Sequence, residues 1–328
     1  MNTGTDISTG EPDPAGEPDP AGEPDPTGEP DPTGAGGGAF GAEDWDGVGV
    51  GDGSGGAGDL YGRDHSPLRI LRLYFRFLGT HFRGAMEYRA DFWIMMVAAV
   101  LTQAVSVVVL TAIFRLIPEL KDWTFWPIVI MFGMVTLGEG VGSLCFEGMW
   151  RVAWLINQGE LDYMLVRPYP VLLQVTSSEI GLNGLGNITT GAAMLVLGVL
   201  HSSIHWTVAT VVVGMILLVS GVTVKVAISL ATNSASFWVA SPSPLFAMAV
   251  HQAGELTRYP LTLFPSPLRV TLTVAVPFAF IGFFPTDFLT GGHALWIALV
   301  TPAVAGYCLL MAVVIFRRGM LRYESTGS

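Results

Sequence analysis

The sequence predicts an all-α membrane protein with six transmembrane helices, an N-terminal interfacial amphipathic helix and a re-entrant segment before the last span. Of the 328 residues, 51% are hydrophobic and 13% are charged, whereas a soluble domain carries roughly 25% charged residues. The mean hydropathy of +0.52 agrees with this class. Several apolar stretches are long enough to cross the ~30 Å hydrocarbon layer as helices, because a helix rises ~1.5 Å per residue.

The first 64 residues have a different character. Gly-Glu-Pro-Asp-Pro occurs four times in residues 10–33, and a Gly-rich stretch follows. Frequent prolines prevent helix formation, repeated carboxylates repel one another, and little apolar surface is available for burial. The sequence therefore predicts a disordered acidic Pro/Gly-rich tail over 1–64, which is either an interaction tail or a solvated extension. The transmembrane domain is expected over 65–328.

Residues 67–89 are predicted to form the interfacial helix. Four apolar residues share one helical face, and three arginines lie on another: Leu71, Phe75, Leu78 and Phe82, against Arg69, Arg72 and Arg76. Such a helix places its apolar face among lipid acyl chains and its arginines at anionic headgroups. The alternative is a simple flank of the first span.

Six spans are predicted at about 92–114, 125–146, 180–200, 206–231, 237–255 and 294–316. Arginines cluster before the first span, in the loop after the second and after the last one. The positive-inside bias makes that loop and both termini cytoplasmic, which requires an even number of crossings. We therefore expect a multi-pass protein of the cell (plasma) membrane.

The apolar segment 268–284 should not cross fully, because prolines divide its surroundings into short pieces. We interpret 258–288 as a re-entrant helical pair that enters from the outer side, and irregular backbone there must be buried in protein or line a wet cavity. Its marker residues are Tyr259, Pro260, Pro265 and Pro277. In the rival topology 268–284 is a true span and 237–255 lies on the surface.

Ionisable residues inside spans are functional candidates, because an unpaired charge in lipid is costly. The candidates are Glu139, Lys225 and Glu255, with His251 beside them. Glu139 lies roughly 21 Å along its helix from the outer end and Lys225 roughly 28 Å along its own, so the two either form an ion pair or Lys225 snorkels toward the cytoplasm. Glycines in the second and third spans predict close helix packing.

Neither of the two lysines, Lys121 and Lys225, can complete G-x-x-x-x-G-K-[ST], so the sequence predicts no phosphate-binding loop. No catalytic residues and no metal site are predicted either. A bundle without nucleotide-binding equipment must take its energy from elsewhere if it transports against a gradient.

The loop after the second span contains Gly159, Leu161, Asp162, Leu165, Arg167 and Pro168 in the order G-x-L-D-x-x-L-x-R-P. This pattern resembles the signature of a permease family in the ABC-2 type exporter class. The proline-rich segment that begins at Tyr259 and the basic C-terminus from Arg317 resemble the same family, so the likeness covers roughly residues 66–328.

The resemblance implies an ATP-driven export permease that pairs with a second permease, as a heterodimer or a homodimer. It also implies a separate cytoplasmic ABC ATPase dimer that binds ATP and Mg, with no cofactor in this chain. Membrane lipids are the other expected partner, and no nucleic acid is expected. An ion-coupled secondary transporter and an intramembrane lipid-modifying enzyme are the alternative functions.

On this reading residues 153–170 couple the permease to the ATPase. The candidate coupling residues are Glu160, Asp162, Arg167, Pro168 and Pro170. The two acids would face basic residues of the ATPase, Arg167 would brace the loop, and the prolines would end the loop helix. Alternatively, Asp162 and Arg167 only satisfy one another across the turn. The transported substrate is not predicted.

Overall fold

A computed structural model of the chain describes residues 67–87, 89–239, 243–292 and 294–323. Within these ranges the regular secondary structure is helical and contains no strand, which confirms the predicted all-α class. The predicted tail over 1–64 lies outside the described residues.

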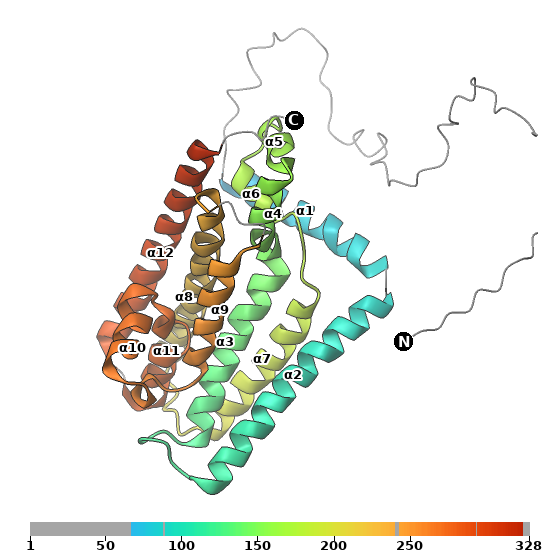
Figure 1. Cartoon of the computed structure of the whole chain (residues 1–328). Coiled ribbons are helices and arrows are strands. Elements are labelled where there is room, and N and C mark those ends of the chain that lie inside the picture. The colour runs from blue at the N-terminus through green and yellow to red at the C-terminus, as the bar shows by residue number, and fades with distance from the viewer. Residues whose placement is uncertain (1–66, 88, 240–242, 293, 324–328) are drawn as a thin grey trace, which may run out of the picture. The chain divides into compact units, whose positions relative to one another are not determined.

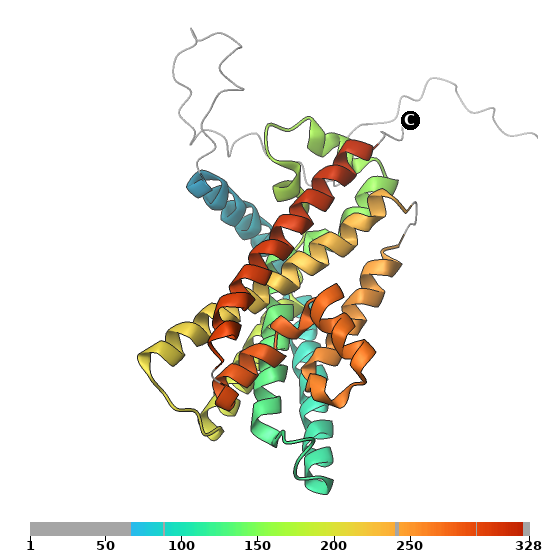
Figure 2. The same ribbon diagram turned by 90° about the vertical axis from the view of Figure 1, so that its left-hand side faces the viewer.

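Five helices of the described part are long and apolar enough to cross a bilayer: Arg89–Leu116, Phe125–Asn157, Asn183–His201, Val208–Phe237 and Trp296–Arg322. They contain the long elements α2 (Arg89–Leu116), α3 (Phe125–Phe146), α7 (Asn183–His201), α8 (Val208–Asn233) and α12 (Leu295–Arg322). The helices run side by side as a bundle (Figures 1 and 2). Their outward faces remain apolar, as a lipid environment requires, and Leu101, Val105 and Val108 of α2 are examples.

The remaining helices are shorter. Those that begin before residue 240 are α1 (Pro67–Glu87), η2 (Glu147–Arg151), α4 (Val152–Asn157), α5 (Glu160–Leu165), α6 (Val171–Thr176) and η3 (Ser234–Phe237). Those that follow are α9 (Leu245–Glu255), η4 (Leu256–Arg258), η5 (Leu261–Leu263), α10 (Ser266–Val270), η6 (Thr271–Ala275), η7 (Phe278–Phe280), α11 (Phe283–Asp287) and η8 (Phe288–Gly292). Helix α1 matches the predicted interfacial helix in extent and lies across the direction of the bundle (Figure 1).

Helix α3 forms the centre of the bundle. Its residues 128–136 are all buried, because α3 is apolar on every side and is covered on every side. Its contact with α7 is unusually close: a Cβ atom built at Gly140 would lie 2.6 Å from the backbone nitrogen of Ile188, and one built at Gly191 would lie 2.7 Å from that of Leu137. The predicted small-residue contact between the second and third spans is therefore present. Gly142, two residues after Gly140 and so on the other side of α3, has open space around it.

The predicted span 237–255 is divided in the structure. Helix α8 continues through η3 to Phe237, and α9 begins only at Leu245. With 11 residues, α9 is about 17 Å long and cannot cross the hydrocarbon layer alone. The physical reason is the preceding sequence Ser-Pro-Ser-Pro, whose last member, Pro244, is the N-cap of α9. Proline lacks the N–H that a continuous helix needs at this point.

A bent helical pair, Ser266–Ala275 and Phe278–Gly291, follows α9 with an angle of 76° between its arms. Its first arm starts near the end of the bundle where α3 begins. Lys121, just before α3, donates from Nζ to the carbonyl of Thr262, which lies just before this arm. Its bend reaches the middle of α8, where Ile281 packs against Gly221, and its second arm returns past Gly214 of the same helix. Both arms therefore lie in one half of the bundle, an arrangement compatible with the predicted re-entrant segment.

Candidate coupling loop and intramembrane charge network

The loop between α3 and α7 contains the candidate coupling residues. Its short helices η2, α4, α5 and α6 gather at one end of the bundle, beside the C-terminal end of α12 (Figures 1 and 2). Gly159 joins α4 to α5 with a φ of 70°, a left-handed conformation that glycine adopts without steric cost. This turn allows α5 to fold back on α4.

The loop is anchored to the bundle by apolar contacts. Leu155 of α4 and Leu161 of α5 are buried in one cluster with Leu230 of α8 and with Ala312 and Phe316 of α12. A force applied to α5 therefore reaches two long helices directly, because close-packed interiors transmit displacement.

Polar contacts brace the loop from inside. Gln174 Nε2 donates to the Met164 and Tyr169 carbonyls at 3.0 and 2.9 Å, which ties α6 to the end of α5. Arg151 lies 4.4 Å above the Trp154 ring and 3.5 Å from Glu179. These bracing contacts belong to Arg151, whereas the predicted brace, Arg167, is an exposed side chain.

The predicted coupling residues fall into two groups. Glu160 and Asp162 occupy the first turn of α5 and are half-buried, whereas Arg167, Pro168 and Pro170 are exposed. Burial raises the pKa of the Tyr323 phenol, and the neighbouring Asp162 carboxylate raises it further. Asp162 therefore lies against the end of α12. Pro170 is the N-cap of α6, so a proline does mark a new helix as expected.

Three apolar side chains of α5 and its C-cap point away from the loop. Tyr163 is 73% exposed and Val166 is 82% exposed, with Leu165 between them at 49%. These three residues form what we name the loop ridge. Exposed apolar side chains on a loop with charged neighbours indicate a contact surface. The sequence pattern did not single them out, since a short run of this kind is equally compatible with burial.

The predicted intramembrane ion pair is present. Lys225 Nζ of α8 lies 2.7 Å from Glu139 Oε2 of α3, and the lysine side chain is only 6% exposed. Lys225 therefore does not snorkel toward the cytoplasm. Glu139 Oε1 also lies 3.7 Å from His251 Nε2 of α9. The carboxylate thus joins three helices.

A second ion pair, which the sequence analysis missed, continues the network. Arg258 of η4 lies with its Nε 2.6 Å from Glu255 Oε2 and donates to Gln103 Oε1 of α2 at 2.9 Å. It is 92% buried. Gln103 also contacts Thr136 of α3 and Asn187 of α7 at 3.4 Å each. The polar groups therefore connect η4 with five longer helices, α2, α3, α7, α8 and α9.

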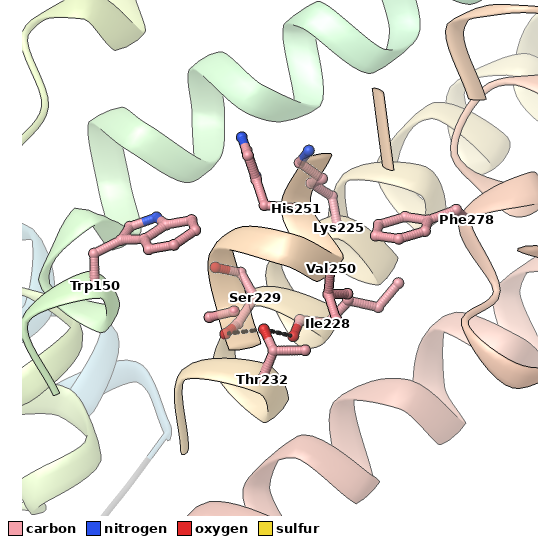
Figure 3. A pocket seen from close by; sticks show the side chains of 9 residues that line it. Trp150, Lys225, Ile228, Ser229, Thr232, Val250, His251 and Phe278 are labelled. Carbon is pink, nitrogen blue, oxygen red and sulfur yellow. Dashed lines mark hydrogen bonds between the residues drawn. The ribbon is translucent and has the colours of Figure 1, made fainter. Parts of the chain in front are cut away.

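Two adjoining cavities open beside the network. Figure 3 shows the one that lies between α8 and α9, with Trp150 and Phe278 at its edges. Trp150, Lys225, Ser229 and His251 line both, and each has room for roughly one water molecule. Among the described residues, Glu139, His251 and Glu255 offer donor atoms within 4.8 Å of one another and could hold a metal ion. Lys225 and Arg258 already balance the two carboxylates, so the cluster reaches neutrality through its own side chains.

The re-entrant marker residues take separate places. The Tyr259 ring meets the Phe132 ring of α3 edge-on at 5.3 Å, and Pro260 begins the turn η5. Pro265 is the N-cap of α10, and Pro277 lies at the bend of the helical pair. The prolines therefore set where each short helix starts, and Tyr259 fixes the segment to the bundle core.

The whole arrangement is a helical bundle with a polar loop at one end and a bent pair at the other. Residues 100–327, well over half of the chain, match the family model for the ABC-2 family transporter protein. The chain belongs to this family. It is thus a multi-pass membrane permease of an ABC transporter, and the ATPase activity of such a transporter lies in a separate subunit. No curated protein and no solved structure matches the permease.

Proposed function

We propose that the permease forms the translocation pathway of an ATP-driven exporter together with a second permease, in a heterodimer or a homodimer. A separate ABC ATPase dimer binds ATP and Mg and drives the cycle through residues 153–170. The observation that carries this proposal is the construction of that loop, which is exposed on its outer side and packed against α8 and α12 on its inner side. Both termini lie on the cytoplasmic side in this arrangement.

The loop can transmit movement from the ATPase to the bundle because its outer side is exposed and its inner side is packed against the long helices. The loop ridge and Arg167 are available to the ATPase. Leu161 and Asp162 face the bundle, where Asp162 lies beside Tyr323 at the end of α12. Movement of the ATPase would therefore displace α5, and α5 would carry α12 with it.

The test uses two substitutions in the loop and one control at the opposite end. Asp162→Ala and Arg167→Ala should uncouple ATP hydrolysis from transport in the reconstituted complex while the permease still reaches the membrane. Glu119→Ala removes an exposed acid from the loop between α2 and α3 and should leave coupling unchanged. Normal coupling in both loop variants would contradict the proposed role of residues 153–170.

The structure gives less support to the two alternatives. An ion-coupled secondary transporter normally has broken spans in both halves, and the described residues have their bent pair in the C-terminal half. An intramembrane lipid-modifying enzyme would need a free acid and base, but Glu139 and Glu255 are each within 2.7 Å of a cationic side chain. We therefore retain the export permease as the proposed function.

A further inference from the structure

Helix α1 presents three distinct faces, because successive residues of a helix are ~100° apart. The first face contacts the body of the permease. The Tyr74 hydroxyl donates to the Cys145 carbonyl, and the Tyr74 ring stacks on Phe146 at 5.7 Å. Phe77 meets Tyr169 of the coupling loop edge-on at 6.1 Å. Burial and the neighbouring Cys145 raise the pKa of the Tyr74 phenol.

The second face is apolar and uncovered. Leu71 is 52% exposed, Phe75 is 58% exposed and Met86 is 38% exposed. These residues lie on one side of α1, roughly opposite to the face that carries Phe77. An apolar face at the end of a membrane bundle, on a helix lying across the bundle axis, is the arrangement of a helix embedded in the bilayer interface.

The third face carries positive charge. Arg72, Arg76 and Arg83 are all exposed, and their directions around the helix fall within ~40° of one another. They form a single stripe along the border of the apolar face. Glu87, the last residue and the one acid of α1, lies four residues after Arg83 on the same side of the helix, so it offsets one of the three positive charges of the stripe. Three guanidinium groups beside a membrane-embedded face match the phosphates of anionic lipids in position and in sign.

We propose that α1 binds anionic phospholipid headgroups through Arg72, Arg76 and Arg83. This binding changes the position of the coupling loop through the Phe77–Tyr169 contact. This goes beyond a general affinity for lipid, since it makes lipid charge a regulator of the loop. Its link to transport rests on the proposed function of residues 153–170.

The path from α1 to the loop consists of consecutive contacts. Phe77 touches the Tyr169 ring. The Tyr169 carbonyl accepts a hydrogen bond from Gln174, and the same amide group donates to the Met164 carbonyl in α5. A shift of α1 toward or away from the headgroups therefore changes the position of Tyr169, and Gln174 relays that change to α5.

Hydrogen exchange of the whole chain in nanodiscs tests both parts of the proposal without the ATPase. Amides of α1 and of α5 should exchange more slowly in phosphatidylcholine with phosphatidylglycerol than in phosphatidylcholine alone. An arginine near an anionic surface contributes about fivefold in affinity, so the triple variant Arg72→Gln/Arg76→Gln/Arg83→Gln should weaken lipid association of α1 on the order of 100-fold and remove the difference. Arg115→Gln, at the far end of α2, is the matched charge control and should preserve it.

A second variant separates binding from transmission. Phe77→Ala should keep the lipid-dependent protection of α1 and lose that of α5. Equal exchange of α5 in the two lipid mixtures would overturn the proposal, and so would an unchanged response in the triple variant. An equal response to inorganic phosphate in phosphatidylcholine discs would show a site for free anions and would also overturn it. None of these results depends on ATP hydrolysis, so failure here is distinguishable from failure of the proposed function.

Discussion

Removal of one partner from the Glu139–Lys225 pair should destabilise the permease more than removal of both. At 2.7 Å and an effective dielectric constant of about 20, the attraction is about 6 kcal/mol before desolvation is subtracted. Lys225→Met removes the cation that contacts the Glu139 carboxylate directly and leaves the half-buried His251 as its nearest basic neighbour. Loss of one partner of a buried pair typically costs about 3–5 kcal/mol, whereas replacement of both partners is close to neutral. We therefore expect a coupling free energy of at least about 2 kcal/mol between the two positions.

The assay is a double-mutant cycle of thermal unfolding, with Lys225→Met, Glu139→Gln and the double variant in the same lipid nanodiscs. Each single variant should unfold on the order of 10 °C below the unchanged permease, and the double variant should recover most of that loss. A charge-swapped variant, Glu139→Lys/Lys225→Glu, should recover part of it. The reasoning would be refuted by a Lys225→Met variant that is as stable as the unchanged permease, because a snorkelling lysine is expected to behave in that way.

Three further outcomes follow from the geometry. Gly140→Val should destabilise the bundle by about 1–3 kcal/mol through overpacking against α7, whereas Gly142→Val, with open space around it, should be nearly neutral; equal unfolding temperatures would contradict the close contact. Replacement of Tyr163 and Val166 by Ser should change stability by less than about 0.5 kcal/mol but abolish copurification of the ATPase, and full retention of the ATPase would argue against the loop ridge. The Arg258→Lys variant should unfold at a lower temperature than the unchanged permease, since an ammonium group cannot contact Glu255 and Gln103 at the same time as the planar guanidinium does. An unaltered unfolding temperature would mean that this double contact contributes nothing to stability.

The long helices could be predicted from the sequence because length and hydropathy decide them. An uncharged run such as 92–114 must form a helix in lipid to satisfy its backbone hydrogen bonds, and the structure has α2 there. The Glu139–Lys225 pair could also be predicted, since the helical rise per residue places both side chains at a similar depth in the membrane. The start of α9 at Leu245, inside the predicted span 237–255, could not be read from hydropathy, because a hydropathy average takes no account of the prolines that end a helix.

The second half of the charge network could not be predicted in the same way. Arg258 precedes Tyr259 and Pro260, a sequence that suggests an interface, yet the structure buries it in the bundle. Its spacing of three residues from Glu255 was the available signal, because residues at i and i+3 of a helical turn are neighbours. Its contact with Gln103 joins positions 155 residues apart, and only the tertiary fold brings them together.

The coupling loop was likewise predictable in position but not in orientation. The motif located the loop, and the fold decided which of its side chains face outward. Asp162 is predicted to face the ATPase; in the structure it is half-buried beside Tyr323, whereas Tyr163 points away from the bundle. Leu161 fixes this arrangement, since its burial against α8 and α12 leaves its neighbours no other orientation. A six-residue helix is too short for sequence periodicity to reveal this orientation.

We propose that a separate ATPase drives this permease through the loop after α3. The most direct measurement is the ATP hydrolysis that copurifies with the tagged chain from its native membrane, compared with the Tyr163→Ser/Val166→Ser variant. We predict an ATPase subunit and ATP hydrolysis with the unchanged chain, and the loss of both with the variant at equal permease yield. A chain that purifies without any ATPase yet still moves a solute across a vesicle membrane would contradict the account.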